Sequence, residues 1–113
     1  MNKYTLITQL HTNKALTTLE SAYVKAKIND FADAEEMFIY CVGKYKLNYQ
    51  DVPEEYKTNA YVVAMAVVNN PEMYEQVKSA DLNTFRKICR ILTLAEKNMI
   101  RKTLDEKNQE ATK

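Results

Sequence analysis

Glycine, proline and histidine are scarce in this chain of 113 residues, and tryptophan is absent. With one glycine and two prolines, the chain has little material for β-hairpin turns, which favour Asn-Gly, Asp-Gly or Gly-Gly pairs. Connections between helices need no glycine, because Asn, Asp, Ser and Thr can cap helix ends. These scarcities therefore favour an all-α fold.

The composition also excludes several classes of protein. The chain has too little Gly and Pro for collagen, too little Cys for a disulfide framework and, at 46% hydrophobic residues, too much apolar content for a disordered chain. No apolar run approaches the roughly 20 residues that span a bilayer, and residues 1–10 lack the long apolar core of a signal peptide. We therefore expect a single soluble domain in the cytoplasm, without membrane association.

Side chains suited to catalysis or metal binding are few. His11 is the only histidine, so no Ser-His-Asp or Cys-His arrangement can form without it. Cys41 and Cys89 fall in apolar helical patterns, outside any CxxC or Cys/His cluster, and we expect them to be buried and inert. A disulfide between them is the alternative, which chains without a secretory signal seldom form. With no glycine-rich phosphate loop either, we predict no enzyme activity, no metal and no cofactor.

Apolar residues spaced three and four apart predict a compact bundle of five to seven short helices. The expected helices are 4–11, 14–28, 34–42, 59–68, 71–78, 82–92 and 94–106, with one helical turn in the connection 44–57. Their expected N-terminal caps include Thr12 or Asn13, Asp33, Thr58, Asn70 and Asp81. Gly43 is expected just beyond its helix, in a left-handed conformation.

Two of these helices carry specific expectations. In 14–28, helical spacing places four apolar side chains toward the core, namely Leu16, Leu19, Tyr23 and Ile28. The segment 59–68 (NAYVVAMAVV) has no charged residue, and a helix that is apolar on nearly all sides is typically buried at the centre of a fold. A central strand is the competing interpretation, but turns for neighbouring strands are missing. The same surface could instead form half of a homodimer seam.

The C-terminal part contains a predicted break. Thr93 and Glu96 have the spacing of a capping box, so we favour two helices over one continuous helix. We expect the domain to span 1–104 and the polar residues 105–113 to be a frayed tail. On one continuous helix, four basic residues would lie within about 60° of one another and form a stripe that suits phosphates or an acidic protein surface: Arg86, Arg90, Lys97 and Arg101. A solvated outer face is the plainer interpretation.

Charge and tyrosine are unevenly distributed, although the formal net charge is only +1. Residues 30–75 carry nine acids and three lysines, whereas residues 76–104 carry seven basic residues and two acids. Tyrosine is enriched at protein interfaces, and four of the eight lie in or beside predicted connections: Tyr45, Tyr49, Tyr56 and Tyr74. They make 44–57 and 70–78 a candidate surface for a basic partner. The alternative is that these tyrosines seal helix ends.

A weak repeat of 25 residues runs through the middle of the chain. Its identical pairs are Val42 and Val67, Tyr49 and Tyr74, and Val52 and Val77. Each unit would be a helical hairpin that must stack on its neighbour to bury its apolar face.

Two segments resemble known families. Residues 46–77 contain a VPEE turn (52–55), then an apolar helix that ends near Asn70-Pro71. In these features they resemble the short helical-hairpin repeats of unknown function found in effector-like bacterial, protist and large-virus proteins. That resemblance implies stacked helices and no activity.

Residues 83–106 are similar to the C-terminal helix-turn-helix of the small anti-sigma proteins of T4-type phages. The similarity lies in Phe85-Arg86-Lys87-Ile88, Leu92-Thr93 and Glu96-Lys97. It implies a protein that binds a bacterial sigma factor and redirects the host RNA polymerase. Together, the two resemblances favour a non-catalytic protein-binding module, a small adaptor or inhibitor encoded by a phage or another mobile element, with a host protein as its partner. The alternative is a nucleic-acid-binding transcriptional regulator that uses its basic C-terminal helix.

Overall fold

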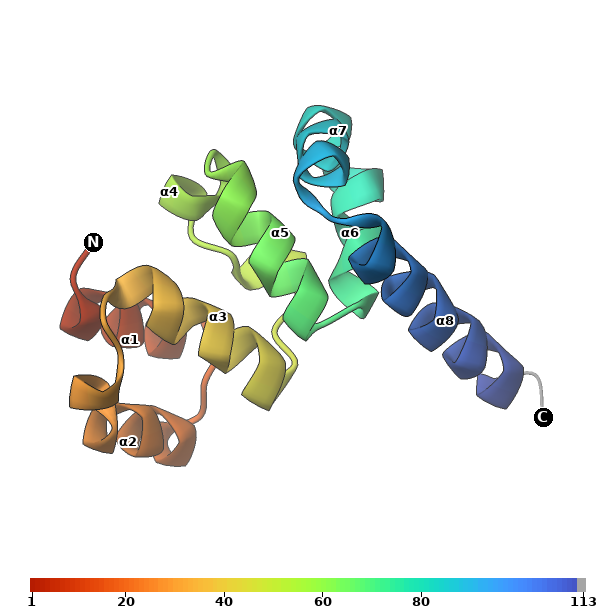
Figure 1. The fold of residues 1–113 in the computed structure, drawn as a ribbon. Coiled ribbons are helices and arrows are strands. Elements are labelled where there is room, and N and C mark those ends of the chain that lie inside the picture. Colours follow the sequence, from red (N-terminus) through yellow and green to blue (C-terminus); the bar gives the residue numbers. More distant parts are fainter. Residues whose placement is uncertain (112–113) are drawn as a thin grey trace.

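The computed structural model describes residues 1–111, with side chains as far as Gln109. In that range eight α-helices and two 3₁₀ turns follow one another without a strand (Figure 1). The bounds are α1 (Lys3–Thr12), α2 (Thr18–Ala26), η1 (Ile28–Asp30), α3 (Ala34–Tyr45), η2 (Tyr49–Asp51), α4 (Glu54–Lys57), α5 (Ala60–Asn69), α6 (Glu72–Ala80), α7 (Leu82–Ile91) and α8 (Leu94–Ala111). The predicted all-α bundle is confirmed. The described range has one helix more than the expected maximum of seven, because the helical turn expected within 44–57 forms the short helix α4.

Helix α5 is the centre of the fold, as predicted. It packs against α3, α4, α6 and α7, and the side chains of Val63, Ala64, Ala66 and Val67 have no exposed area. Burying one valine fully contributes roughly 1.5–3 kcal/mol, so this helix supplies a large share of the core. The alternative of a central strand is wrong.

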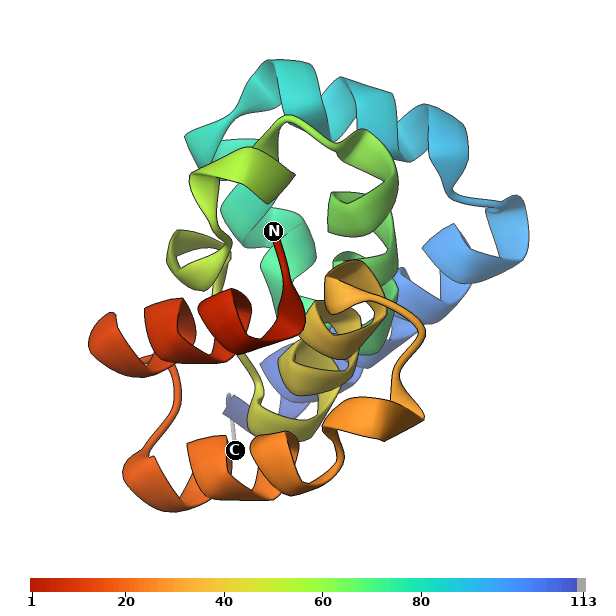
Figure 2. The same ribbon diagram turned by 90° about the vertical axis from the view of Figure 1, so that its left-hand side faces the viewer.

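The other helices lie on two sides of α5. Helix α1 packs against α2 and α3 on one side, and α6 and α7 pack together on the other. Figures 1 and 2 show α8 beyond α6 and α7, on the side away from α1. Within residues 1–111, no helix combines the length and the apolar character that crossing a membrane requires.

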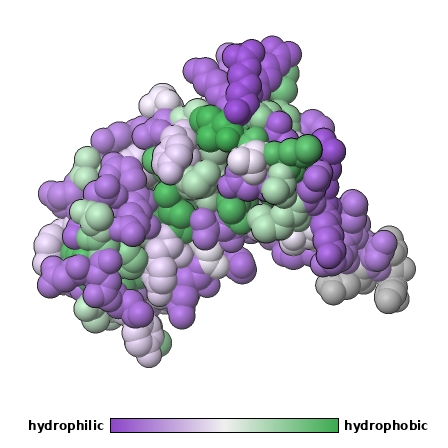
Figure 3. All heavy atoms as spheres, viewed as in Figure 1, coloured by the Kyte–Doolittle hydropathy of each residue, from purple (hydrophilic) through white to green (hydrophobic). Residues whose placement is uncertain are grey.

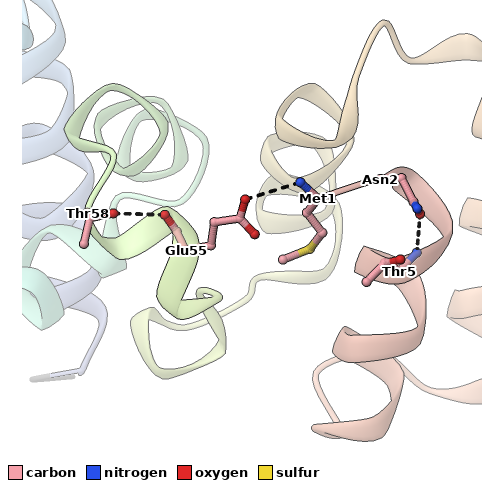
Figure 4. Close-up of polar contacts among 5 residues, drawn as sticks. All are labelled: Met1, Asn2, Thr5, Glu55 and Thr58. Carbon is pink, nitrogen blue, oxygen red and sulfur yellow. Dashed lines mark hydrogen bonds and ion pairs between the residues drawn. The ribbon is translucent and has the colours of Figure 1, made fainter.

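Polar contacts link α1 to α4 across the N-terminal half (Figure 4). The amino group of Met1 lies 3.3 Å from Oε1 of Glu55. Asn2 caps α1, because its Oδ1 accepts a hydrogen bond from the Thr5 amide at 2.8 Å, and the Thr58 hydroxyl donates to the Glu55 carbonyl at 3.1 Å. The Met1–Glu55 ion pair joins the residues before α1 to α4, which are 54 residues apart in sequence, and the other two contacts are local to α1 and α4.

The predicted break between α7 and α8 is confirmed. Helix α7 ends at Ile91, and α8 begins at Leu94. The Thr93 amide donates to the Glu96 carboxylate at 2.8 Å, and the Glu96 amide donates to the Thr93 hydroxyl at 3.1 Å. This reciprocal capping box satisfies two amides that the new helix start would otherwise leave without partners.

Asp33 and Asp81 cap α3 and α7 as predicted. Asp33 accepts from the Glu36 amide at 2.8 Å, while the Glu36 carboxylate turns back to the amide of Ala32 and not to that of Asp33. Asp81 accepts from both the amide and the hydroxyl of Thr84, at 3.1 and 2.7 Å. These two hydrogen bonds hold the pKa of Asp81 below its usual range.

The predicted start of the second helix is wrong. Asn13 is the C-terminal cap of α1, Thr12 is the last residue of that helix, and Lys14 takes a positive φ of 64° as the chain reverses. Helix α2 begins later, after Thr17, which forms a complete capping box with Glu20. The capping box gives hydrogen-bond partners to the amides of Thr17 and Glu20. It therefore favours this helix start over one that has a single side-chain cap.

Two further caps differ from the prediction. Asn59 caps α5 through the Val62 amide, and Thr58 instead ends α4. The Asn70 side chain is buried and donates to the Leu47 carbonyl at 2.7 Å, so it ties down the preceding connection and does not cap α6. A carbonyl buried in a connection needs such a partner.

Gly43 lies inside α3, and the prediction that it ends the helix is wrong. Lys46 takes the left-handed position instead, with φ 53°. A Cβ atom at position 43 would lie 3.3 Å from Cβ of Asn69. The glycine therefore allows α3 and the end of α5 to approach closely.

The two units of the predicted repeat share core positions but differ in form. Val42 and Val67 are fully buried on α3 and α5, which pack together, and Val52 and Val77 are also buried. The second part of the first unit is η2 with α4, whereas in the second unit it is the regular helix α6.

The expected frayed tail is helical as far as the structure describes it. Helix α8 continues to Ala111, and Lys107 forms an ion pair with Glu72 of α6. The side chains of 105–109 are exposed, in line with their polarity. No glycine or proline follows Leu104 to end the helix, and residues 112–113 lie outside the described part.

Candidate protein-binding groove

Leu19 and Tyr23 face solvent, contrary to the predicted core face of 14–28. Their exposed fractions are 65% and 59%, whereas Leu16 and Ile28 are buried as expected. Helix α2 begins at Thr18, and Val24 is its fully buried residue. The inward side of the helix is therefore the side of Val24. Leu19 and Tyr23 are four residues apart, so they lie on consecutive turns of one outward face.

A groove of about 210 Å³ lies between α2 and α3. Its lining consists of Leu19, Glu20, Tyr23, Lys27, Tyr40, Lys44 and Tyr45. This volume exceeds the ~150 Å³ cavity that holds a benzene molecule and falls below the roughly 300 Å³ at which small-molecule sites begin. The groove therefore has room for one large apolar or aromatic side chain.

Packing fixes the α3 wall of the groove. The ring of Tyr40 lies 5.1 Å from that of Phe31, in a tilted arrangement, and both Tyr40 and Tyr45 are half-buried. Burial, reinforced by the neighbouring Tyr40 and Cys41, raises the pKa of Tyr45. Its hydroxyl is thus protonated at neutral pH and available as a hydrogen-bond donor.

The four predicted tyrosines do not form one surface. Tyr45 lines the groove, but Tyr49 and Tyr56 are only 6% and 2% exposed. Tyr56 packs against Phe38 with ring centroids 5.5 Å apart, and Tyr74 is half-buried against α7. The structure instead brings Tyr45 together with Tyr23 and Tyr40, which sequence reasoning did not select. The sequence signal for this site is the pair Leu19 and Tyr23, four residues apart. Residues on a buried helix face have the same spacing, so the sequence alone could not show that the pair faces outward.

The four predicted basic residues are divided between two helices. Arg86 and Arg90 lie on the exposed side of α7, whereas Lys97 on α8 is half-buried. Arg101 lines a different hollow of about 320 Å³ between α6 and α8, beside Tyr74. The break at Thr93 thus prevents the continuous stripe that a single helix would form. None of the four makes an ion pair with a carboxylate among residues 1–109.

A second apolar surface lies on the outward side of α5. Tyr61 is 61% exposed, and Met65 and Val68 are half-buried on the same side of the helix. Ile91 and Leu94, at the junction of α7 and α8, are 39% and 73% exposed. Figure 3 shows apolar side chains on this face, over α5 and near α8, bordered by hydrophilic ones. Of the five residues named here only Tyr61 has a polar side-chain group, whereas the groove lining has three tyrosines, two lysines and a glutamate, so the groove is the stronger candidate.

A larger cavity of about 680 Å³ is lined by polar groups that already have partners. Its lining is Asn48, Tyr49, Gln50, Lys57, Gln76, Ala80 and Asp81. Gln76 accepts from the Tyr49 amide at 2.8 Å and donates to Asn48 at 3.0 Å, and Lys57 pairs with Glu54 at 3.0 Å. The contacts of Gln76 join η2 to α6, so these polar groups serve to hold the fold together.

The groups considered for catalysis are dispersed. Cys41 is fully buried, and burial raises the pKa of its thiol to about 12, so the thiol is protonated and a poor nucleophile at neutral pH. Cys89 is half-buried, and both thiols are free. His11 is exposed on α1, with Nδ1 3.2 Å from the Leu16 carbonyl oxygen.

No protein-family model, curated protein or solved structure matches this chain. The resemblances of 46–77 and of 83–106 therefore stay predictions. What the molecule can bind must be inferred from its own surfaces, of which the groove between α2 and α3 combines exposed apolar area, enclosure and polar groups.

Proposed function

We propose that this chain is a non-catalytic protein-binding module of the cytoplasm, a small adaptor or inhibitor. Its groove between α2 and α3 would receive one large side chain of a partner protein. The observation that carries the proposal is the pair Leu19 and Tyr23, each more than half exposed at the mouth of the groove. Single exposed apolar residues are common, but Tyr23 belongs to a residue type enriched among the anchors that dominate interface energies, and Leu19 extends its apolar area beside the pocket.

The rigidity of the walls supports the same function. Both sides of the groove are helices, and Phe31 holds the Tyr40 ring in place. A partner that docks here orders few additional side chains, which lowers the entropic cost of binding. A host protein as partner, and a phage or mobile element as source, rest on the resemblance of 83–106 to phage anti-sigma proteins.

The test compares two double variants in affinity capture. Leu19→Ser with Tyr23→Ser alters the groove, and Leu82→Ser with Tyr4→Ser removes a leucine and a tyrosine of similar exposure, 51% and 59%, from other surfaces. We expect a partner retained by the wild type and by the control to be lost by the groove variant, with unchanged thermal melts. If the groove variant retains the same partners as the wild type, the proposal is wrong.

Nucleic-acid binding through α7 is the second candidate. Arg86 and Arg90 are one turn apart, exposed, and without an ion-pair partner among the described residues. If they contact phosphates, binding of a labelled DNA or RNA should weaken steeply with salt, since counterions are released. Arg86→Ala with Arg90→Ala should abolish it. No binding at low salt would exclude this candidate.

A further inference from the structure

The groove between α2 and α3 has many hydrogen-bond donors, and two of its three charged side chains are positive. Lys27 and Lys44 both line it, and the ammonium group of neither forms an ion pair or a hydrogen bond with another residue among 1–109. Glu20 is the single acid in the lining, and its carboxylate already accepts from the Thr17 amide at 2.8 Å. The lining therefore carries two positive charges against the one negative charge of Glu20, a net charge of +1.

The tyrosines add to this donor surface. Tyr23, Tyr40 and Tyr45 place three phenol groups in the same lining. A tyrosine phenol keeps its proton at neutral pH, and burial raises the pKa of Tyr45 further. A phenol donates well to a carboxylate, and such charge-assisted hydrogen bonds are stronger than neutral ones.

We infer that the segment which docks in this groove is acidic, with one large apolar side chain flanked by Asp or Glu. This inference rests on the proposed function, because it names the chemistry of the partner at the same site. The apolar side chain fills the pocket between Leu19 and Tyr23, and the flanking carboxylates meet Lys27 and Lys44. A basic segment would be repelled by these lysines, and a neutral one would leave both without a partner.

The test measures the binding of three labelled peptides by fluorescence anisotropy. The peptides share one central leucine and differ in the flanking residues, which are Glu, Gln or Lys. We expect the Glu peptide to bind most tightly and the Lys peptide most weakly. Lys27→Gln with Lys44→Gln should weaken the Glu peptide by about tenfold, since each exposed ion pair contributes up to about fivefold, and should leave the Gln peptide unchanged.

A matched control separates a local effect from overall charge. Lys25→Gln with Lys46→Gln also removes two positive charges, but from exposed positions outside the groove lining. We expect this control to change the affinity for the Glu peptide by less than twofold. Equal affinity for the Glu and Gln peptides, equal weakening by both double variants, or no binding of the Glu peptide would each overturn the inference.

The inference and the proposed function can fail separately. If the partner captured by the wild type is lost by the Leu19→Ser, Tyr23→Ser variant but retained equally by Lys27→Gln, Lys44→Gln, the groove binds protein and its partner is not acidic. Thermal melts of the lysine variants check a further outcome. Both lysines lie at helix ends, where cations favour the helix dipole, and a lower melting temperature with unchanged peptide binding would also overturn the inference.

Discussion

At the scale of single residues, Gly43 lies where α3 and α5 approach each other closely. A Cβ atom there would already lie 3.3 Å from the Asn69 side chain. Any larger side chain must push the two helices apart, and they form one of the main contacts of the core.

Gly43→Val should therefore lower the free energy of unfolding by about 1–3 kcal/mol, the usual cost of overpacking. Gly43→Ala should change it little, because alanine's higher helix propensity, about 1 kcal/mol, offsets the tight contact. Denaturant melts of the two variants measure both values. A valine variant as stable as the wild type would show that α3 and α5 separate easily at this point.

The buried thiol of Cys41 predicts a loss of stability in alkali. Its pKa rises from 9.0 to about 12 on folding, so between these values the unfolded chain has lost a proton that the folded chain keeps. The free energy of unfolding should fall as pH rises through this window, by up to about 1.4 kcal/mol per pH unit from this group. Denaturant melts at pH 8 and pH 10.5 should show a smaller fall in the free energy of unfolding for Cys41→Ala than for the wild type. The fall is measured for each protein from its own value at pH 8, because the variant starts from a lower stability. An equal fall in both proteins would contradict the assignment.

At the scale of elements, α8 has a single buried side chain among residues 94–109, although it is the longest described helix. Ile100 is fully buried, but Leu104 is only half-buried and the remaining apolar residues Leu94 and Met99 are largely exposed. The ion pair of Lys107 with Glu72 lies on the surface, where such pairs contribute at most about 1 kcal/mol. Ile100 therefore acts as the main anchor of this helix.

Ile100→Ala should release α8 without unfolding α5. Truncating a buried isoleucine typically costs 2–5 kcal/mol, which we expect to appear as local opening. Amide hydrogen exchange should accelerate in 97–109 and stay slow in α5. Met99→Ala, at a neighbouring position that is 42% exposed, is the control and should leave exchange unchanged. Equal acceleration in α5 would mean that α8 is an integral part of the core.

The elements also show what local patterns can and cannot predict. The buried helix α5 and the break at Thr93 followed from residues close together in sequence: an uncharged apolar run, and a capping box. The exposure of Leu19 and Tyr23 did not, because their spacing fits an inward face equally well. Which side of α2 turns inward depends on the chain reversal at Lys14 and on packing against α1, both set by tertiary structure. The groove lies between two helices, so it could not be predicted from the sequence alone.

At the scale of the whole molecule, a single chain buries its own core. The central residues of α5, Val63 and Val67 among them, have no exposed area without any partner chain, which favours a monomer over the homodimer seam considered from the sequence. Analytical ultracentrifugation should give a species of 13.1 kDa at micromolar concentration. A dimer that Met65→Glu dissociates would contradict this expectation and identify the outward side of α5 as its interface.

The two candidate surfaces belong to helices on opposite sides of α5. Helices α2 and α3, which form the groove, lie on one side, and α7, which carries Arg86 and Arg90, lies on the other (Figure 1), in a molecule about 36 Å long. If both proposed surfaces bind, a partner at one would not obstruct the other, and the protein would join two different macromolecules.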